Sequence, residues 1–134
     1  MAKGAAEVVI DRPADEVWAR VGNFADPSWI PTVDWSEVDG DLRTTRERGH
    51  ESQQRLVAHD DEARTLSYVL ASEVRLPDGQ LAKVSATISV TPEGPSSSRM
   101  SWGYDTGPDD THGQIGDFYG SILATLKQTL EGTT

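Results

Sequence analysis

Residues 6–35 read AEVVIDRPADEVWARVGNFADPSWIPTVDW, and this stretch decides the fold more than any other. The apolar run at 7–11 predicts a short strand. Asp11 and Pro13 then supply helix-start chemistry, a capping acid and a proline near the first turn, where a missing N–H costs nothing. An amphipathic helix is expected next, because apolar residues follow at three- and four-residue spacing: Val17, Trp18, Val21 and Phe24.

A second short turn or helix, which carries Trp29, begins at Asp26-Pro27 and is stopped by Pro31. Large aromatic residues at helical spacing bury much area and belong to a core more often than to a ligand site. We therefore assign Trp18, Phe24 and Trp29 to the core.

From residue 33 onward the apolar period changes to two, which is typical of strands. Turn signals such as Asp39-Gly40-Asp41 separate the segments. The predicted strands are 33–39, 42–48, 51–59, 64–72, 81–91 and 99–106. Residues 74–80 are expected to form a loop, and a broad apolar stripe predicts a long helix from about residue 110 to 131.

Composition limits the possible functions. The chain has 134 residues and no cysteine, so we expect one domain over 1–134 without disulfides or zinc–thiolate sites. A net charge of −10 argues against nucleic-acid binding, because phosphate contacts need a basic surface. No segment is apolar enough for a signal peptide or a membrane span, so we expect a cytoplasmic protein without integral membrane association, either a monomer or a homodimer.

Several short segments occur in an order and spacing that carry a resemblance over nearly the whole chain. They are residues 13–18 (PADEVW), Phe24 with Trp29 and Pro31, 37–41 (EVDGD), 54–56 (QRL), 60–68 (DDEARTLSY) and Trp102. Together they resemble the START/Bet v 1-like (SRPBCC) superfamily, within it the bacterial polyketide cyclase/dehydratase and lipid transport-like family. The resemblance implies an α+β helix-grip fold. In that fold a seven-stranded antiparallel sheet wraps around a long C-terminal helix, with two short helices after the first strand.

The resemblance also implies a ligand cavity between the sheet and the C-terminal helix, and no cofactor. In ligand-gated relatives two loops close over the ligand, and the corresponding segments here are 48–51 and 74–79, the second of which carries Leu76. Strand alternation selects the side chains on the inner face, including Ala58 on the strand 51–59. The predicted ligand-binding residues are Trp35, Thr45, Glu47, Gln54, Leu56, Tyr68, Leu76, Val84, Ala86, Trp102, Tyr104, Phe118, Tyr119 and Ile122.

The strand 42–48, LRTTRER, permits two opposite registers. One set of side chains would face inward and the other outward. The sets are Arg43, Thr45 and Glu47, inward in the register that the resemblance implies, and Thr44, Arg46 and Arg48. A buried Glu47 would have to find a partner or become neutral. Alternatively the strand lies near a sheet edge with its charges solvated.

Few residues point to catalysis. The three histidines lack metal-ligand spacing, so no metal site is expected, and no serine sits in a nucleophile elbow. By the resemblance, the candidates are Glu47 as acid/base and Tyr68 and Tyr104, with Gln54, as orienting groups.

Three functions stay open at this point. The first is binding of a hydrophobic or amphipathic small molecule such as a lipid, polyketide or aromatic compound. The second is a cofactor-independent polyketide cyclase/dehydratase-like reaction, and the third is a chaperone-activator-like interaction domain with a collapsed cavity. The fold hosts binders and enzymes alike, so it does not choose among them.

Overall fold

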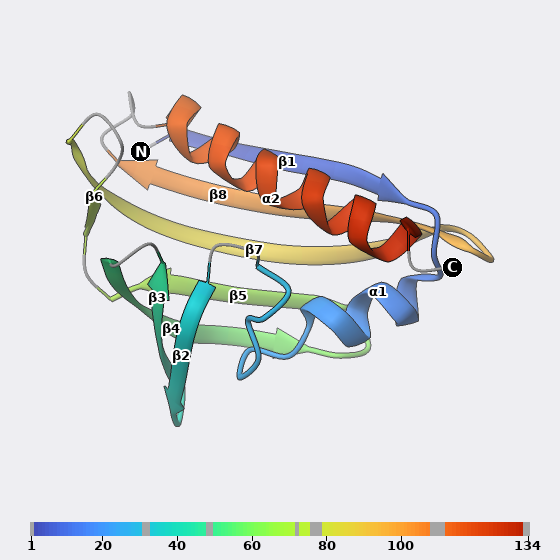
Figure 1. The fold of residues 1–134 in the computed structure, drawn as a ribbon, viewed down its shortest axis with the longest axis horizontal. Helices are drawn as coiled ribbons and strands as arrows, with labels where there is room; N and C mark the ends of the chain where they lie inside the picture. Colours follow the sequence, from blue (N-terminus) through green and yellow to red (C-terminus); the bar gives the residue numbers. More distant parts are fainter. Residues whose placement is uncertain are drawn as a thin grey trace.

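The computed structural model describes residues 2–30, 33–47, 50–71, 73–75, 79–107 and 112–132. Figure 1 shows one curved sheet with a long helix lying across it. The elements in chain order are β1 (Ala2–Ile10), α1 (Ala14–Val21), β2 (Val33–Asp39), β3 (Leu42–Glu47), β4 (His50–Asp60), β5 (Thr65–Leu70), β6 (Val74–Arg75), β7 (Leu81–Gly94), β8 (Ser97–Gly107) and α2 (His112–Gly132).

Seven strands follow the order β1-β8-β7-β5-β4-β3-β2, and every neighbouring pair is antiparallel. The two-residue strand β6 pairs with the start of β7, where the sequence predicted a loop. Helix α2 packs on β1 and β8, so its apolar stripe faces the concave side of the sheet (Figure 1). This arrangement confirms the expected helix-grip architecture.

The core lies between α2 and the inner face of the sheet. Every second residue is buried from Ala82 to Val90 on β7 and from Ser98 to Thr106 on β8, as strand alternation predicts. The buried side of α2 consists of Ile115, Tyr119, Ile122, Leu123 and Leu126. Burying these apolar side chains is the main source of stability for the contact between the helix and the sheet.

The region after β1 differs in detail from the prediction. The N-cap position of α1 is Pro13, not Asp11, and no side chain caps the helix. In place of a second helix, residues 23–30 form separate turns, with hydrogen bonds from Asp26 N to Asn23 O and from Ile30 N to Pro27 O. Such isolated bonds between residues three apart do not propagate into a helix.

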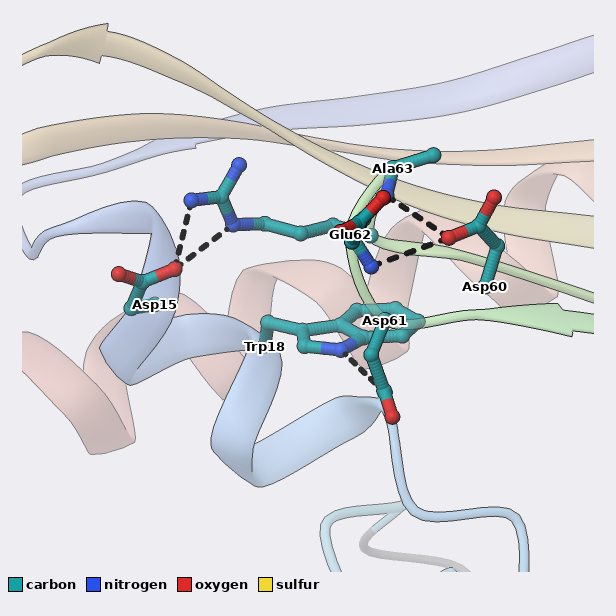
Figure 2. Close-up of polar contacts among 7 residues, drawn as sticks. Asp15, Trp18, Asp60, Asp61, Glu62 and Ala63 are labelled. Carbon is teal, nitrogen blue, oxygen red and sulfur yellow. Dashed lines mark hydrogen bonds and ion pairs between the residues drawn. The ribbon is translucent and has the colours of Figure 1, made fainter.

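Figure 2 shows the hydrogen bonds and the ion pair that join α1 to the turn between β4 and β5. Arg64 Nε and Nη2 donate to Asp15 Oδ1 at 2.9 and 2.6 Å, and Trp18 Nε1 donates to Asp61 Oδ1 at 3.0 Å. Asp60 Oδ1 accepts the backbone N–H groups two and three residues further along, which closes the turn. Arg64 adopts φ 55°, a left-handed conformation that costs an L-residue about 1–2 kcal/mol. The bonds to Asp15 help to hold Arg64 in it.

A β-bulge changes which side chains of β4 face inward. Leu56 pairs with Tyr68, but the next pair joins Ala58 to Ser67, so Val57 is an extra residue. Beyond the bulge the alternation is reversed, and Ala58 is exposed on the outer face. The prediction that Ala58 faces inward is therefore wrong.

Within the described residues, neither helix is long and apolar enough to cross a membrane.

Candidate functional site

An aromatic cluster lies between the sheet and α2. Tyr68 from β5 and Trp102 from β8 meet Tyr119 from α2, and all three side chains are buried. Trp102 Nε1 donates to the Tyr68 hydroxyl at 3.1 Å, and the Tyr68 and Tyr119 hydroxyls are 3.3 Å apart. The Trp102 and Tyr119 rings stack with centroids 3.9 Å apart. These contacts join three elements around one pair of phenol groups.

Two further aromatic residues complete this cluster. Trp29, from the turns after α1, lies 5.3 Å from Trp102 between ring centroids, and Tyr104 meets Tyr119 edge to face at 5.7 Å. The Tyr104 hydroxyl approaches α2 at Gly116, where an added Cβ would lie only 2.5 Å from the hydroxyl oxygen. Gly116 therefore makes room for Tyr104.

A buried polar cluster lies beside the aromatic one, on β3 and β4. Arg43 is only 6% exposed, and its Nε donates to Gln54 Oε1 at 2.8 Å while Nη1 donates to the Phe24 carbonyl at 3.1 Å. Gln54 Nε2 donates in turn to the hydroxyls of Thr45 and Ser52, at 3.1 and 2.9 Å. The guanidinium carbon lies 4.4 Å from the centroid of the Phe24 ring. The polar groups are thus joined in one network.

Arg43 also connects the two clusters, because its guanidinium lies 5.7 Å from the centroid of the Tyr68 ring. Burial lowers the pKa of the guanidinium, and Tyr68 and Glu47 act in the opposite direction. An arginine nevertheless stays charged in proteins. The site therefore holds a buried positive charge beside two phenols.

The same environment keeps both phenols neutral. Burial raises the pKa of Tyr68, although hydrogen bonds from Tyr119 and Trp102 and the charge of Arg43 partly offset this. Burial also raises the pKa of Tyr119 well above its ordinary value of 10.0, and Tyr68 and Glu47 raise it further. At neutral pH both hydroxyls keep their proton, and the one that does not donate to the other can donate a hydrogen bond to a ligand.

Most predicted site residues meet here. Glu47, at the end of β3, and Leu56 are half-buried. Leu76 lies outside the described residues, as do parts of both loop segments compared with gating loops. The buried members are Thr45, Gln54, Tyr68, Val84, Ala86, Trp102, Tyr104, Tyr119 and Ile122. The buried Arg43 and Thr45 also show that the register implied by the resemblance is the one adopted, and that Arg46 faces solvent.

Trp35 does not belong to this interior. A bulge between Val33 and Trp35 turns Trp35 to the outer face, where it is 42% exposed and lies beside Arg46, 5.1 Å from guanidinium carbon to ring centroid. The prediction that Trp35 lies on the inner face with the other ligand-binding residues is wrong for this reason.

Phe118 lies at the border of the interior and is 39% exposed. Lys127, nine residues further along α2, donates to the Val9 carbonyl of β1 at 2.8 Å. Nine residues correspond to about half a rotation around a helix axis, so Phe118 lies on the flank that faces away from β1.

Arg43 is the principal functional candidate missing from the predicted set. The alternation of the strand 42–48 placed Arg43 on the same face as Thr45 and Glu47. The alternation alone could not show that other residues bury this face. The cover comes from Phe24, far away in sequence. Among the described residues, no group of three or more histidine or acidic side chains is placed to hold a metal ion.

Comparison with known proteins gives a family and a fold. The sequence profile described as polyketide cyclase / dehydrase and lipid transport matches residues 1–131. No curated protein sequence matches the chain.

Many solved structures share the fold. An uncharacterized protein from Bacillus thuringiensis is 19% identical, with TM-score 0.84, over 96% of this chain and 98% of that one. The di-domain ARO/CYC BexL from the BE-7585A biosynthetic pathway is 21% identical, with TM-score 0.78, over 98% of this chain and 47% of that one. A START superfamily protein from Mycobacterium smegmatis is 14% identical, with TM-score 0.70, over 96% of this chain and 98% of that one. These similarities confirm the START-like fold that the sequence predicted.

Proposed function

This chain belongs to the polyketide cyclase / dehydrase and lipid transport family, and from that premise we propose that it binds an amphipathic small molecule between the sheet and α2. We propose further that this ligand is an aromatic or polyketide-like compound carrying an acidic oxygen. Binding, rather than catalysis, is the leading function.

The buried guanidinium of Arg43 is the observation that carries the proposal. A guanidinium has five N–H donors, and the hydrogen bonds to Gln54 and Phe24 described above use two of them within the described residues. A ligand carboxylate, enolate or phenolate would accept the remaining donors and compensate a charge that is otherwise costly to bury. The neighbouring rings of Tyr68, Trp102 and Tyr119 would contact a flat apolar body.

The test compares two ligands of one shape and different charge. Displacement of anilinonaphthalene sulfonate by naphthoate and by its neutral amide, naphthamide, gives the preference for an anion. We expect wild-type protein to prefer naphthoate by about tenfold or more, and Arg43→Met to lose most of that preference, as the loss of a charge-assisted hydrogen bond predicts. Arg43→Lys keeps the charge and serves as the control, and it should retain part of the preference.

Equal affinity of the wild-type protein for both compounds would contradict the role of Arg43. Failure to bind the fluorescent probe or any co-purifying compound in native mass spectrometry would contradict ligand binding altogether. That result would favour the interaction domain with a collapsed cavity.

The pair of neutral phenols favours a second candidate, a cofactor-independent cyclase/dehydratase-like reaction. A tyrosine hydroxyl beside a positive charge can donate to a carbonyl oxygen that becomes an enolate, and Glu47 is the candidate base at the border of the site. Under this function Tyr68→Phe should lower turnover of a linear poly-β-ketone analogue by about 10²-fold or more while leaving its binding constant nearly unchanged. Equal loss of binding and turnover would count against it.

A further inference from the structure

The Tyr68 hydroxyl is approached by two other buried hydrogen-bonding groups. Trp102 Nε1 lies 3.1 Å from its oxygen, and the Tyr119 hydroxyl lies 3.3 Å away. The three side chains are between 2% and 5% exposed. An indole N–H can only donate, so the Tyr68 oxygen accepts the bond from Trp102. Trp102 also stacks on Tyr119, with ring centroids 3.9 Å apart, and so fixes both phenols relative to each other.

The two phenols hold one hydroxyl proton more than their contacts use. Each hydroxyl has one proton to donate, and the bond between Tyr68 and Tyr119 uses one of the two. In the part of the chain that the structure describes, neither hydroxyl has a further acceptor for the other proton. A buried donor without an acceptor is costly, so an oxygen atom of a ligand in the site would complete the set.

The charge of Arg43 decides which phenol donates to that ligand. Its guanidinium carbon lies 5.7 Å from the centroid of the Tyr68 ring, so an anionic oxygen bound to its remaining N–H groups lies beside Tyr68. An anionic oxygen is the strongest acceptor in the site and therefore takes the hydrogen bond from Tyr68. Tyr119 then donates to Tyr68, which also accepts from Trp102, and the bonds in such a chain strengthen one another.

The pKa directions of the two phenols agree with this order. Burial raises the pKa of Tyr68, whereas the hydrogen bonds from Tyr119 and Trp102 and the charge of Arg43 lower it. For Tyr119, burial and the neighbouring Tyr68 both act to raise the pKa, which lies well above its ordinary value. Tyr68 is therefore the stronger acid of the pair and the better donor.

We propose that the site binds a phenol or an enol as its anion, that Tyr68 donates to the ionised oxygen, and that Trp102 and Tyr119 are positioning residues behind Tyr68. The inference rests on the proposed function, because it narrows the acidic oxygen of the ligand to one that ionises on binding. A positive charge and a hydrogen-bond donor directed at one oxygen stabilise its anion. The proton that the ligand loses goes to the solvent.

Para-nitrophenol is a suitable probe, because its anion absorbs at longer wavelength than the neutral form. At the pH where half of the free phenol is ionised, we expect more than about nine-tenths of the phenol bound to the wild-type protein to be ionised. This fraction corresponds to about tenfold tighter binding of the anion. Nitroanisole, the methyl ether of the same ring, has no proton to lose and measures the binding of the neutral body alone.

Three variants separate the roles in the chain of hydrogen bonds. Tyr68→Phe removes the donor and should lower the ratio of bound anion to bound neutral phenol by about tenfold. Tyr119→Phe and Trp102→Phe keep an aromatic ring and remove one bond behind Tyr68. Each should lower that ratio by about twofold to fourfold, while the affinity for nitroanisole stays within about twofold of wild type. Thr125→Ala, on the exposed side of α2, is the control and should leave both quantities unchanged.

Three results would overturn the inference. A bound phenol that is no more ionised than the free phenol contradicts anion binding by Tyr68, while a preference for naphthoate over naphthamide leaves the proposed function standing. Tyr119→Phe and Trp102→Phe variants that bind nitroanisole more weakly at an unchanged ratio show that these residues only support the fold. A wild-type protein that binds neither naphthoate nor nitrophenol overturns the proposed function and this inference together. If Tyr68→Phe fails to fold, the wild-type ratio and the other two variants still decide.

Discussion

Arg43 Nε donates to Gln54 Oε1 across 2.8 Å, and these two residues face each other on paired strands β3 and β4. The bond joins a buried charge to a neutral amide. Gln54 orients the guanidinium and at the same time satisfies Thr45 and Ser52, so one side chain holds the polar side of the site together.

Gln54→Leu should therefore be strongly destabilising. It leaves the Nε of Arg43 and two hydroxyls without their partner, and an unsatisfied buried polar group costs about 1–3 kcal/mol, more when it is charged. Gln54→Glu keeps an acceptor for Arg43 and should cost less. Urea unfolding measures both, and Gln53→Leu, at the exposed neighbour, should stay within about 0.5 kcal/mol of wild type. A Gln54→Leu variant as stable as the Gln53 control would contradict the network.

Gly116→Ala should destabilise the protein although alanine favours helices. The new Cβ would lie 2.5 Å from the Tyr104 hydroxyl oxygen, and the resulting displacement should cost about 1–3 kcal/mol. Gly120→Ala, on the same helix with nothing within 4 Å, should instead stabilise by about 1 kcal/mol. Adding Tyr104→Phe removes the clashing oxygen and should recover much of the loss. Additive effects in this double-mutant cycle would show that the two residues do not meet.

Alkaline pH should destabilise the protein through Tyr68 and Tyr119. Both have a pKa raised by burial in the folded state, so the unfolded chain loses these protons first, near the ordinary value of 10.0. Their contribution to stability is fully present below that pH and is lost as the pH rises toward the folded pKa values. Each unit of pKa difference corresponds to about 1.4 kcal/mol.

Guanidinium unfolding between neutral pH and pH of about 11 measures this slope. Tyr68→Phe with Tyr119→Phe should make the decline with pH shallower, even if the variant is less stable at neutral pH. If the free energy of unfolding declined equally steeply with pH in wild type and in the double variant, Tyr68 and Tyr119 would not be the cause of the decline.

The indole of Trp18 and the carboxylate of Asp61 should be coupled energetically. Their hydrogen bond joins α1 to the turn after β4 (Figure 2). A cycle of Trp18→Phe and Asp61→Ala should give a coupling of about 0.5–1.5 kcal/mol by thermal or urea unfolding. Glu62→Ala is the control, since its side chain takes no part in the bond, and it should show no coupling to Trp18→Phe.

The hydrophobic pattern of the sequence was sufficient to predict much of the fold. The period of two along β7 predicted its buried face, and the stripe on α2 predicted Tyr119 and Ile122 at the sheet. The resemblance supplied the architecture and the inward register of β3. Local pattern failed at Trp35 and Ala58, because a single extra residue in a ladder depends on the partner strand and reverses the faces beyond it.

The sequence by itself determined the main elements, their order and the buried faces of α2 and β7, because these follow from short-range periodicity and turn chemistry. Only the tertiary structure decided that Arg43 is buried with Gln54 and that three elements bring Tyr68, Trp102 and Tyr119 together. Each of these depends on contacts between residues far apart in the chain. Phe24 covers Arg43, and Tyr119 stacks on Trp102.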